Sequence, residues 1–306
     1  MRLTLGLPRA AVGVAIALAV LGGACGALPS SALAWANGPQ YGEGFGTHDW
    51  ILFQANEDAV AAGYDWVDWK TAQFACDDPD MVLRDFYHHV YDTAGDTYGD
   101  APDRIGELYP QAVGELRRGD RIAASRTVGL LSHYLSDVAN PLHTDQTPAE
   151  KDMHSRYEDA VDNQLESPAD GAAILSARTL TPTGDARGLA AQTAAGAHAD
   201  YEALVAEYVA SGNSAQVQAI SSRSLNAGVG AVTDVIAGVS IDAGVKRGAV
   251  KGGSSAGAAA AGAGTTAPDK AKPSWPLSVW CCLGIGVGLV AMALVALVLT
   301  LRRRRD

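Results

Sequence analysis

The sequence predicts an all-α, multi-helix domain followed by a transmembrane helix near the C-terminal end. Three observations predict this fold class. Apolar residues recur at helical spacing in several long segments, helix start signals precede two of them, and strand signals are scarce. A chain of 306 residues with 48% hydrophobic residues is long enough to form one domain with a sizeable core.

The first helical signal lies in the segment 47–63, which has an apolar face and ends at a glycine. Residues 64–100 are rich in aspartate, tyrosine and glycine, so we expect irregular structure there apart from a short helix near 80–90. The segment 103–119 has a helical pattern that Pro110 is expected to interrupt, because proline lacks the backbone N–H donor.

Stronger start signals follow in the middle of the chain. Asp120 is a typical N-cap for a helix over 120–140. The motif TPAE forms a capping box with proline at the first helical position, and it opens a helix predicted over 147–165. Residues 185–211 and 213–245 are rich in alanine and compatible with further helices.

Both ends of the chain carry signals of an exported and anchored protein. Residues 1–34 have a basic start, an apolar middle and small residues at the end, as in a secretory signal peptide whose cleavage would expose Trp35. A rival cleavage before Cys25 would make a lipoprotein. Residues 275–301 are predicted to form a transmembrane helix, and residues 302–306, four arginines followed by Asp306, a basic cytoplasmic tail. We therefore expect a single-pass protein of the cell membrane with an extracellular catalytic domain.

Residues 249–274 are rich in glycine, alanine and serine and are predicted to form a flexible stalk after the domain 35–248. The formal net charge is −11, so the surface repels nucleic acid at long range and no nucleic-acid partner is expected. No obligate protein partner is evident. Only Cys76 lies in the predicted domain, which excludes an internal disulfide framework and makes metal ions the expected cross-links.

Histidines and carboxylates recur at a spacing that suits metal binding. His133 and Asp137 lie four residues apart on one predicted helix and so share a face. His154 and Glu158 repeat this spacing on the next helix, and His143 lies between the two pairs. Imidazole and carboxylate are ligands that zinc prefers. A single such pair is usually a solvent-exposed ion pair, but two pairs with a histidine between them favour a metal site.

The order of these residues resembles that of the bacterial zinc-dependent phospholipases C. The resemblance rests on the stretches WANGPQYGEGFGTHDWIL, HHVYD, HYLSDVANPLH and HSRYE, which fall within residues 35–165. It implies an all-helical domain that holds three zinc ions in a cleft. Ser136 stands where the family usually has glycine, a small change that we expect to be tolerated.

The resemblance also implies which residues bind the three Zn²⁺ ions. The first ion would be held by Asp77, His89, His133 and Asp137, with Asp78 and His88 as competitors for two of these places. The second would be held by His143, His154 and Glu158. The third would take the α-amino nitrogen and carbonyl oxygen of Trp35 together with His48 and Asp137, so removal of the signal peptide would complete it.

The implied activity is that of a phospholipase C, which hydrolyses phospholipid to diacylglycerol and a phosphorylated headgroup. Asp77 is the candidate to accept a proton from the attacking water. Phe86 lies where the family has an aromatic contact to the headgroup. Two alternatives stay open: a single-strand nuclease or nucleotidase of the same fold, and a non-catalytic surface domain stabilised by zinc. The long gap between Trp35 and His48, and the acid Glu158, favour the phospholipase.

Overall fold

The structure is a computed structural model, and it describes residues 35, 37, 44–93, 95 and 98–248. Contacts within the chain define two units, residues 1–260 and 261–306, and every described residue belongs to the first. The predicted signal peptide, stalk, transmembrane helix and basic tail lie outside the described residues. Their assignments remain predictions.

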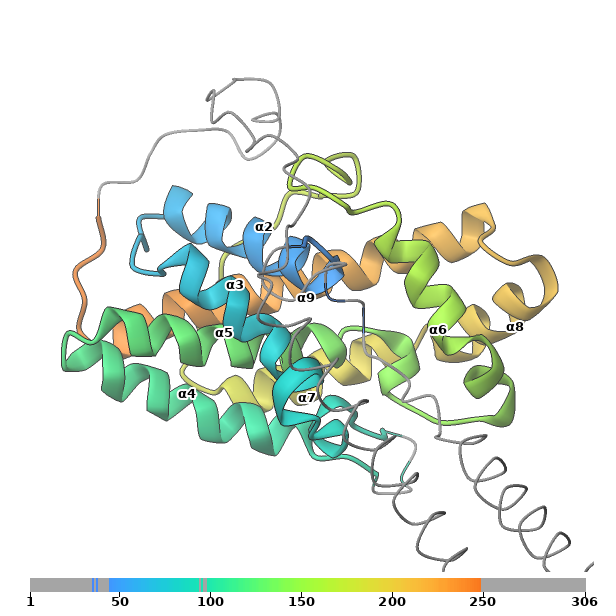
Figure 1. The fold of residues 1–306 in the computed structure, drawn as a ribbon, viewed down its shortest axis with the longest axis horizontal. Coiled ribbons are helices and arrows are strands. Elements are labelled where there is room, and N and C mark those ends of the chain that lie inside the picture. Colours follow the sequence, from blue (N-terminus) through green and yellow to red (C-terminus); the bar gives the residue numbers. More distant parts are fainter. Residues whose placement is uncertain (1–34, 36, 38–43, 94, 96–97, 249–306) are drawn as a thin grey trace, which may run out of the picture. The chain divides into compact units, whose positions relative to one another are not determined.

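The described residues form helices and contain no strand, which confirms the all-α fold class (Figure 1). Most are α-helices, with short π- and 3₁₀-helical turns at three places. In chain order they are α2 (Thr47–Ala61), α3 (Trp69–Asp78), the π-helix η1 (Pro79–Leu83), the 3₁₀-helix η2 (Phe86–His89), α4 (Ala101–Arg117), α5 (Arg121–Asp137), the 3₁₀-helix η3 (Pro141–His143), α6 (Pro148–Asp162), α7 (Ala186–His198), α8 (Tyr201–Ser211) and α9 (Ala215–Asp242).

Helix α5 occupies the centre of the packing and contacts α2, α3, α4 and α9. It begins as predicted, with the Asp120 carboxylate accepting a hydrogen bond from the backbone N–H of Ala123 at 3.0 Å. Its last four turns are buried almost throughout, so they can present polar side chains to the interior. The C-terminal end of this helix therefore lies inside the domain.

Helix α3 overturns the expectation of irregular structure over 64–100. It begins at Asp68, whose carboxylate accepts a hydrogen bond from the Thr71 N–H at 3.0 Å. Its buried residues Ala72 and Cys76 are small, so its sequence carries a weak apolar pattern. Such a short helix is marginal alone and is stabilised by packing against α5.

Helix α4 runs without a break through Pro110, contrary to the predicted interruption. The missing N–H of Pro110 leaves the carbonyl of Gly106 without its helical donor. Both residues line an open pocket on the solvent side of the helix, where water can satisfy that carbonyl. The apolar face with Ile105 and Leu108 stays buried and keeps the helix in place.

Helix α9 is the one helix of the described part of the chain that is long and apolar enough to span a membrane. However, 72% of its apolar window is buried inside the domain, which is typical of a core helix. It packs against α2 and α5, and the Trp66 indole donates to the carbonyl of Ile236 at 3.1 Å. Hydrophobic burial against these helices accounts for its composition.

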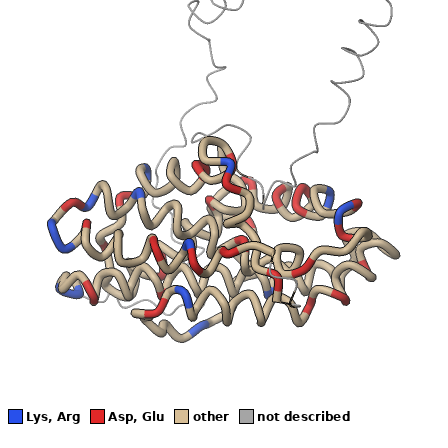
Figure 2. The backbone as a smooth tube through the Cα atoms, turned by 90° about the horizontal axis from the view of Figure 1, so that it is seen from below, with Lys and Arg blue, Asp and Glu red and all other residues tan. Residues whose placement is uncertain are grey.

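Acidic residues recur along most of the described helices, whereas lysine and arginine are fewer (Figure 2). This distribution agrees with the formal net charge of −11 for the whole chain. A surface of this sign favours the approach of cations over that of polyanions.

Candidate metal centre

The last turn of α5 brings His133 and Asp137 into the protein interior, where both side chains are fully buried. The Nδ1–H of His133 donates to the backbone carbonyl of Cys76 at 2.6 Å. This hydrogen bond turns the Nε2 atom toward the other candidate ligands, and Nε2 lies 3.4 Å from Oδ2 of Asp137 and 3.2 Å from Nδ1 of His89.

Asp137 lies at the centre of a cluster of four histidines. Its Oδ1 atom is 3.4 Å from Nε2 of His48 and 3.7 Å from Nδ1 of His143. Its Oδ2 atom is 3.0 Å from Nδ1 of His89 and 3.4 Å from Nε2 of His133. These residues come from α2, η2, α5 and η3, so one carboxylate links four separate segments.

The first group of ligand atoms consists of Asp80, His89 and His133, whose ligand atoms all lie within 4.8 Å of one another. Asp80 Oδ1 is 3.6 Å from His89 Nδ1, and Asp80 Oδ2 is 3.8 Å from His133 Nε2. The side-chain amide of Asn37 donates to Asp80 Oδ2 at 3.0 Å. The segment near the predicted mature N-terminus therefore contacts this group.

Asp80 belongs to this group, whereas the sequence pattern named Asp77 as the acid, and the assignment of Asp77 stays a prediction. The π-helix η1 carries Asp80, and the left-handed Arg84 that ends η1, with φ of 52°, turns the chain toward His89. Asp77 is buried but belongs to none of the groups found among the described residues. Asp78, the other competitor, forms an ion pair with Arg126 at 2.6 Å. The sequence showed several acids before His89 but no signal that distinguished them.

The second group brings together His143, His154 and Glu158, the three residues predicted to share an ion. Glu158 Oε1 is 3.3 Å from Nε2 of His143 and 2.9 Å from Nε2 of His154. Asn140 donates to the same oxygen at 3.0 Å. Pro141 opens the turn η3, and Nδ1 of His143 donates to the carbonyl of His89 at 2.8 Å.

The capping box predicted at the start of α6 is only half formed. The Thr147 hydroxyl accepts a hydrogen bond from the Glu150 N–H at 3.2 Å, as predicted for the N-cap. The Glu150 carboxylate does not return this contact. It is buried and bound to Nδ1 of His154. The sequence therefore assigned Glu150 to a helix cap, whereas the structure places it beside a candidate metal ligand.

The third group consists of His48, Cys76 and His133. The rings of His48 and His133 are stacked with centroids 3.9 Å apart. The indole of Trp35 is buried in the hydrophobic core of the same domain. Binding of an ion by the Trp35 amine stays a prediction, because the residues on either side of Trp35 lie outside the described part of the chain.

The structure also describes three further positions that the sequence singled out. The half-buried Phe86 ring lies 5.7 Å, centroid to centroid, from the ring of His89. His88 points elsewhere and pairs with Asp100, with 2.5 Å between Nδ1 and Oδ1. Ser136 is fully buried, and its hydroxyl donates to the carbonyl of Ser132 at 2.7 Å, so the helix accommodates serine here.

The protonation of these groups depends on burial and on their neighbours. Burial lowers the pKa of His48 to about 4, although Asp137 opposes this shift, so His48 is neutral at pH 7 and can donate a lone pair. Burial raises the pKa of Asp80 to about 7, although His89 opposes this shift. Burial opposes protonation of His89, but the hydrogen bond and charge of Asp137 raise its pKa to about 10. The carboxylates therefore favour a cation at this place.

A metal ion fits this arrangement. Among the described residues, both ring nitrogens of His48 and the Oδ1 atom of Asp80 are buried without a hydrogen-bond partner. Buried polar atoms without partners are costly, and bound cations supply the missing interactions. The donor set of imidazole nitrogens and carboxylate oxygens is one that zinc accepts.

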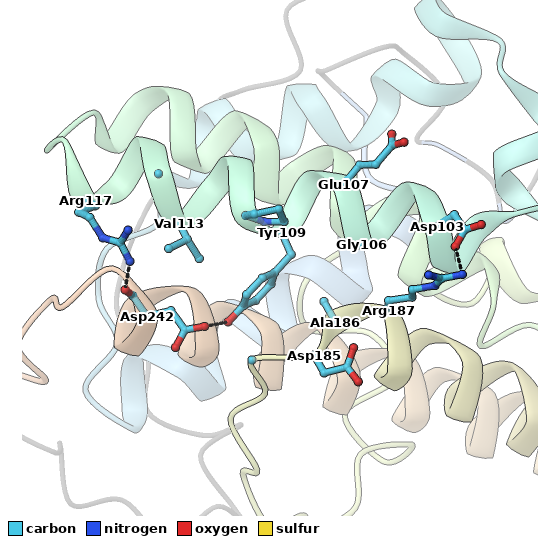
Figure 3. A pocket seen from close by; sticks show the side chains of 13 residues that line it. Asp103, Gly106, Glu107, Tyr109, Val113, Arg117, Asp185, Ala186, Arg187 and Asp242 are labelled. Carbon is cyan, nitrogen blue, oxygen red and sulfur yellow. Dashed lines mark hydrogen bonds and ion pairs between the residues drawn. The ribbon is translucent and has the colours of Figure 1, made fainter.

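A separate pocket of about 900 Å³ lies along α4, the start of α7 and the end of α9 (Figure 3). Its polar groups bind one another. The Tyr109 hydroxyl is 2.7 Å from the Thr183 carbonyl and 2.8 Å from Asp242 Oδ2. The Arg117 guanidinium donates to the Asp242 carbonyl at 2.5 Å. These contacts join α4 to α9, and none of the pocket residues belongs to the three ligand groups.

Solved structures similar to this chain include two clostridial alpha-toxins. Alpha toxin from Clostridium absonum matches with a TM-score of 0.48 and 17% identity, over 68% of this chain and 67% of the toxin. The alpha-toxin of Clostridium perfringens, from avian strain SWCP, matches with a TM-score of 0.42 and 15% identity, over 69% and 67% of the two chains. No family model matches the sequence, and no curated protein does.

Proposed function

We propose that the chain is a zinc-dependent phosphodiesterase, and that it is a phospholipase C acting on phospholipid at a membrane surface. The observation that carries this proposal is Asp137, a fully buried carboxylate within 3.0–3.7 Å of four histidines from four segments. Burying so many ionisable side chains in an all-helical core costs free energy, and bound cations would offset that cost. The order of its residues is that of the resemblance described above.

The ligands that we assign follow the three groups. Asp80, His89, His133 and Asp137 would hold one ion; His143, His154 and Glu158 a second; and His48, Asp137 and the Trp35 main chain a third. Zinc, when bound, supplies a Lewis acid for the phosphoryl oxygens and lowers the pKa of bound water.

The residues of the chain contribute proton transfer and positioning. A carboxylate of the first group accepts the proton of the attacking water, and we assign this role to Asp80 in place of Asp77. The second group offers only three protein ligands, so it leaves room for substrate or water, as catalytic zinc sites do. We assign the headgroup contact to Phe86, whose ring lies 5.7 Å from that of His89.

The ends of the chain support the cellular part of the proposal. The signal-like residues 1–34 and the uncharged apolar residues 275–301 would export the domain and anchor it at the cell membrane. A substrate in that membrane, phospholipid or another phosphodiester, would then be within reach of the domain.

The two alternative functions are those of an enzyme that cleaves nucleic acid and of a domain without catalytic activity. A single-strand nuclease would use the same metal centre, but the acidic surface disfavours a polyanion at long range. A non-catalytic zinc domain would be expected to close each site with four protein ligands, and the second group has three.

The test offers the zinc-loaded full chain, in detergent, to phosphatidylcholine and to single-stranded DNA in parallel. We expect release of diacylglycerol, and loss of that activity by more than about 100-fold in His143→Ala and Glu158→Gln. His88→Ala is the matched control, because His88 lies beside His89 but pairs with Asp100 and should keep the activity. Cleavage of DNA alone would overturn the assignment.

A further inference from the structure

Three of the candidate ligand histidines form a hydrogen bond through the ring nitrogen that faces away from the nearest candidate ligand. His133 Nδ1 donates to the Cys76 carbonyl at 2.6 Å, and His143 Nδ1 donates to the His89 carbonyl at 2.8 Å. His154 Nδ1 is bound instead by the carboxylate of Glu150. The hydrogen-bond partner is therefore a neutral backbone carbonyl for His133 and His143, and a carboxylate for His154.

We propose that Glu150 is a positioning residue for His154 that strengthens zinc binding at the group His143, His154 and Glu158. This inference rests on the proposed function, since it concerns the same metal centre. A carboxylate that accepts the Nδ1–H fixes the tautomer and the ring plane and makes Nε2 a more basic ligand. Nε2 of His154 lies 2.9 Å from Glu158 Oε1, on the ligand side of the ring.

The position of Glu150 is specified by the fold. It lies four residues before His154 on α6, so the two side chains share a face of that helix. Its backbone N–H is held by the Thr147 hydroxyl at 3.2 Å, and the Tyr201 hydroxyl donates to the same Thr147 oxygen at 3.1 Å. The Glu150 side chain is only 3% exposed, so its charge requires a partner in the interior.

The two groups differ in their number of protein ligands, although His89 of the first group also has a carboxylate at its other ring nitrogen, with Asp85 Oδ1 3.4 Å from Nε2. Asp137 adds a carboxylate to the group of Asp80, His89 and His133, which thereby reaches four side chains. The group around Glu158 has three. An additional carboxylate behind one histidine raises the electron density at the metal without occupying a coordination position, so the position open to substrate is kept.

The experiment measures zinc content and zinc affinity of the full chain by competition with a chelator, and needs no substrate. Glu150→Gln keeps the size of the side chain and an acceptor for Nδ1–H but removes the charge. We expect one zinc ion per chain to bind about 10–100-fold more weakly, with the other ions unchanged. Thermal unfolding of the metal-free Glu150→Gln chain measures the separate cost of removing a buried charge beside His154, whereas a purely structural role would not weaken the binding of one ion alone.

The matched control is Asp152→Asn, which removes an exposed negative charge two residues further along the same helix. It should leave every zinc affinity within about twofold of the wild type, because it changes only the weak helix-dipole interaction. In a Glu158→Gln background, Glu150→Gln should cause no additional loss, since both changes act on the same ion.

Equal zinc affinities in the wild type and Glu150→Gln, or equal losses in Glu150→Gln and Asp152→Asn, would overturn the inference. A failure of the proposed function can be distinguished from a failure of the Glu150 inference. A chain that binds zinc but cleaves no phospholipid would contradict the phospholipase assignment while the zinc affinities still test Glu150. A wild-type chain that binds no zinc would contradict both the proposed function and the inference about Glu150.

Discussion

Asp137 shows how one side chain can organise a buried polar cluster. It is fully buried, and the positive charge of neighbouring histidines holds its pKa below the usual range against the opposing effect of burial. Replacing Asp137 by an uncharged residue would leave the neighbouring histidines without their common carboxylate. Removing one partner of a buried charged pair lowers the free energy of unfolding by about 3–5 kcal/mol. This residue is therefore central to folding as well as to the proposed metal centre.

Asp80 and Asp77 provide a direct test of the ligand assignment. We expect Asp80→Asn to lower the zinc content of the chain by one ion and to reduce activity by more than about 100-fold, because Asp80 lies with His89 and His133. Asp77→Asn, of the same size and charge change, should retain both. Zinc content per chain measures the outcome, and loss of an ion in Asp77→Asn alone would restore the assignment based on the sequence.

Trp35 tests the predicted third ion. If its free amine is a ligand, residues placed before Trp35 remove that ligand and should lower zinc content by one ion. The comparison is between the chain cleaved before Trp35 and the same chain with Gly-Ser added there. Equal zinc content in the two would show that the amine takes no part.

Helices α3 and α5 meet more closely than ordinary side chains allow. A Cβ atom at Gly129 of α5 would lie 2.2 Å from the Ala72 carbonyl and 2.9 Å from the Ala75 Cβ. This approach positions Cys76, whose carbonyl accepts the His133 hydrogen bond. The small residue on α5 thus helps to position the candidate ligand His133, which lies four residues further along the same helix.

Gly129→Ala should therefore destabilise the protein by about 1–3 kcal/mol or more, because the helices must separate. The control is Gly196→Ala on α7, where an added Cβ meets nothing within 4 Å. There we expect a gain of about 0.5–1 kcal/mol, since alanine is the better helix former. Urea unfolding measures both, and an unchanged midpoint in Gly129→Ala would contradict the close approach.

A helix could be predicted from the sequence when local capping residues mark its start, and not when it is stabilised mainly by packing against another helix. Helices α5 and α6 carry their own start signals at Asp120 and Thr147, so their beginnings were predicted correctly. Helix α3 has small buried residues and depends on its partner, so it was missed. Pro110 was wrongly expected to break α4, because the sequence does not show that it faces solvent.

In the domain as a whole, the candidate ligands connect α2, η1, η2, α5, η3 and α6. Without bound cations, their carboxylates would repel one another and some of their polar atoms would lack a partner. Cys76 is the one cysteine of the described residues, so no disulfide replaces these links there. Metal ions bound by the native state alone would stabilise it through mass action.

Chelation should consequently lower the melting temperature of the full chain. An ion present at a thousandfold excess over its Kd contributes about 4 kcal/mol, and about 2–4 °C per kcal/mol applies to a domain of this size. We expect a fall of roughly 8–16 °C for each such ion, reversed by added zinc. Differential scanning calorimetry measures it, with Glu158→Gln showing a smaller fall. A melting temperature that chelator leaves unchanged would count against bound metal.

The sequence by itself determined the helical class and the spacing of His133–Asp137 and His154–Glu158, because a four-residue repeat puts two side chains on one face of a helix wherever that helix lies. It also indicated His89 and His143 through their order. Only the tertiary structure decided that Asp80 joins the first group and that Glu150 supports His154. Both choices depend on how a π-turn and a helix start are packed against distant residues, and distances across the fold are not encoded in spacing along the chain.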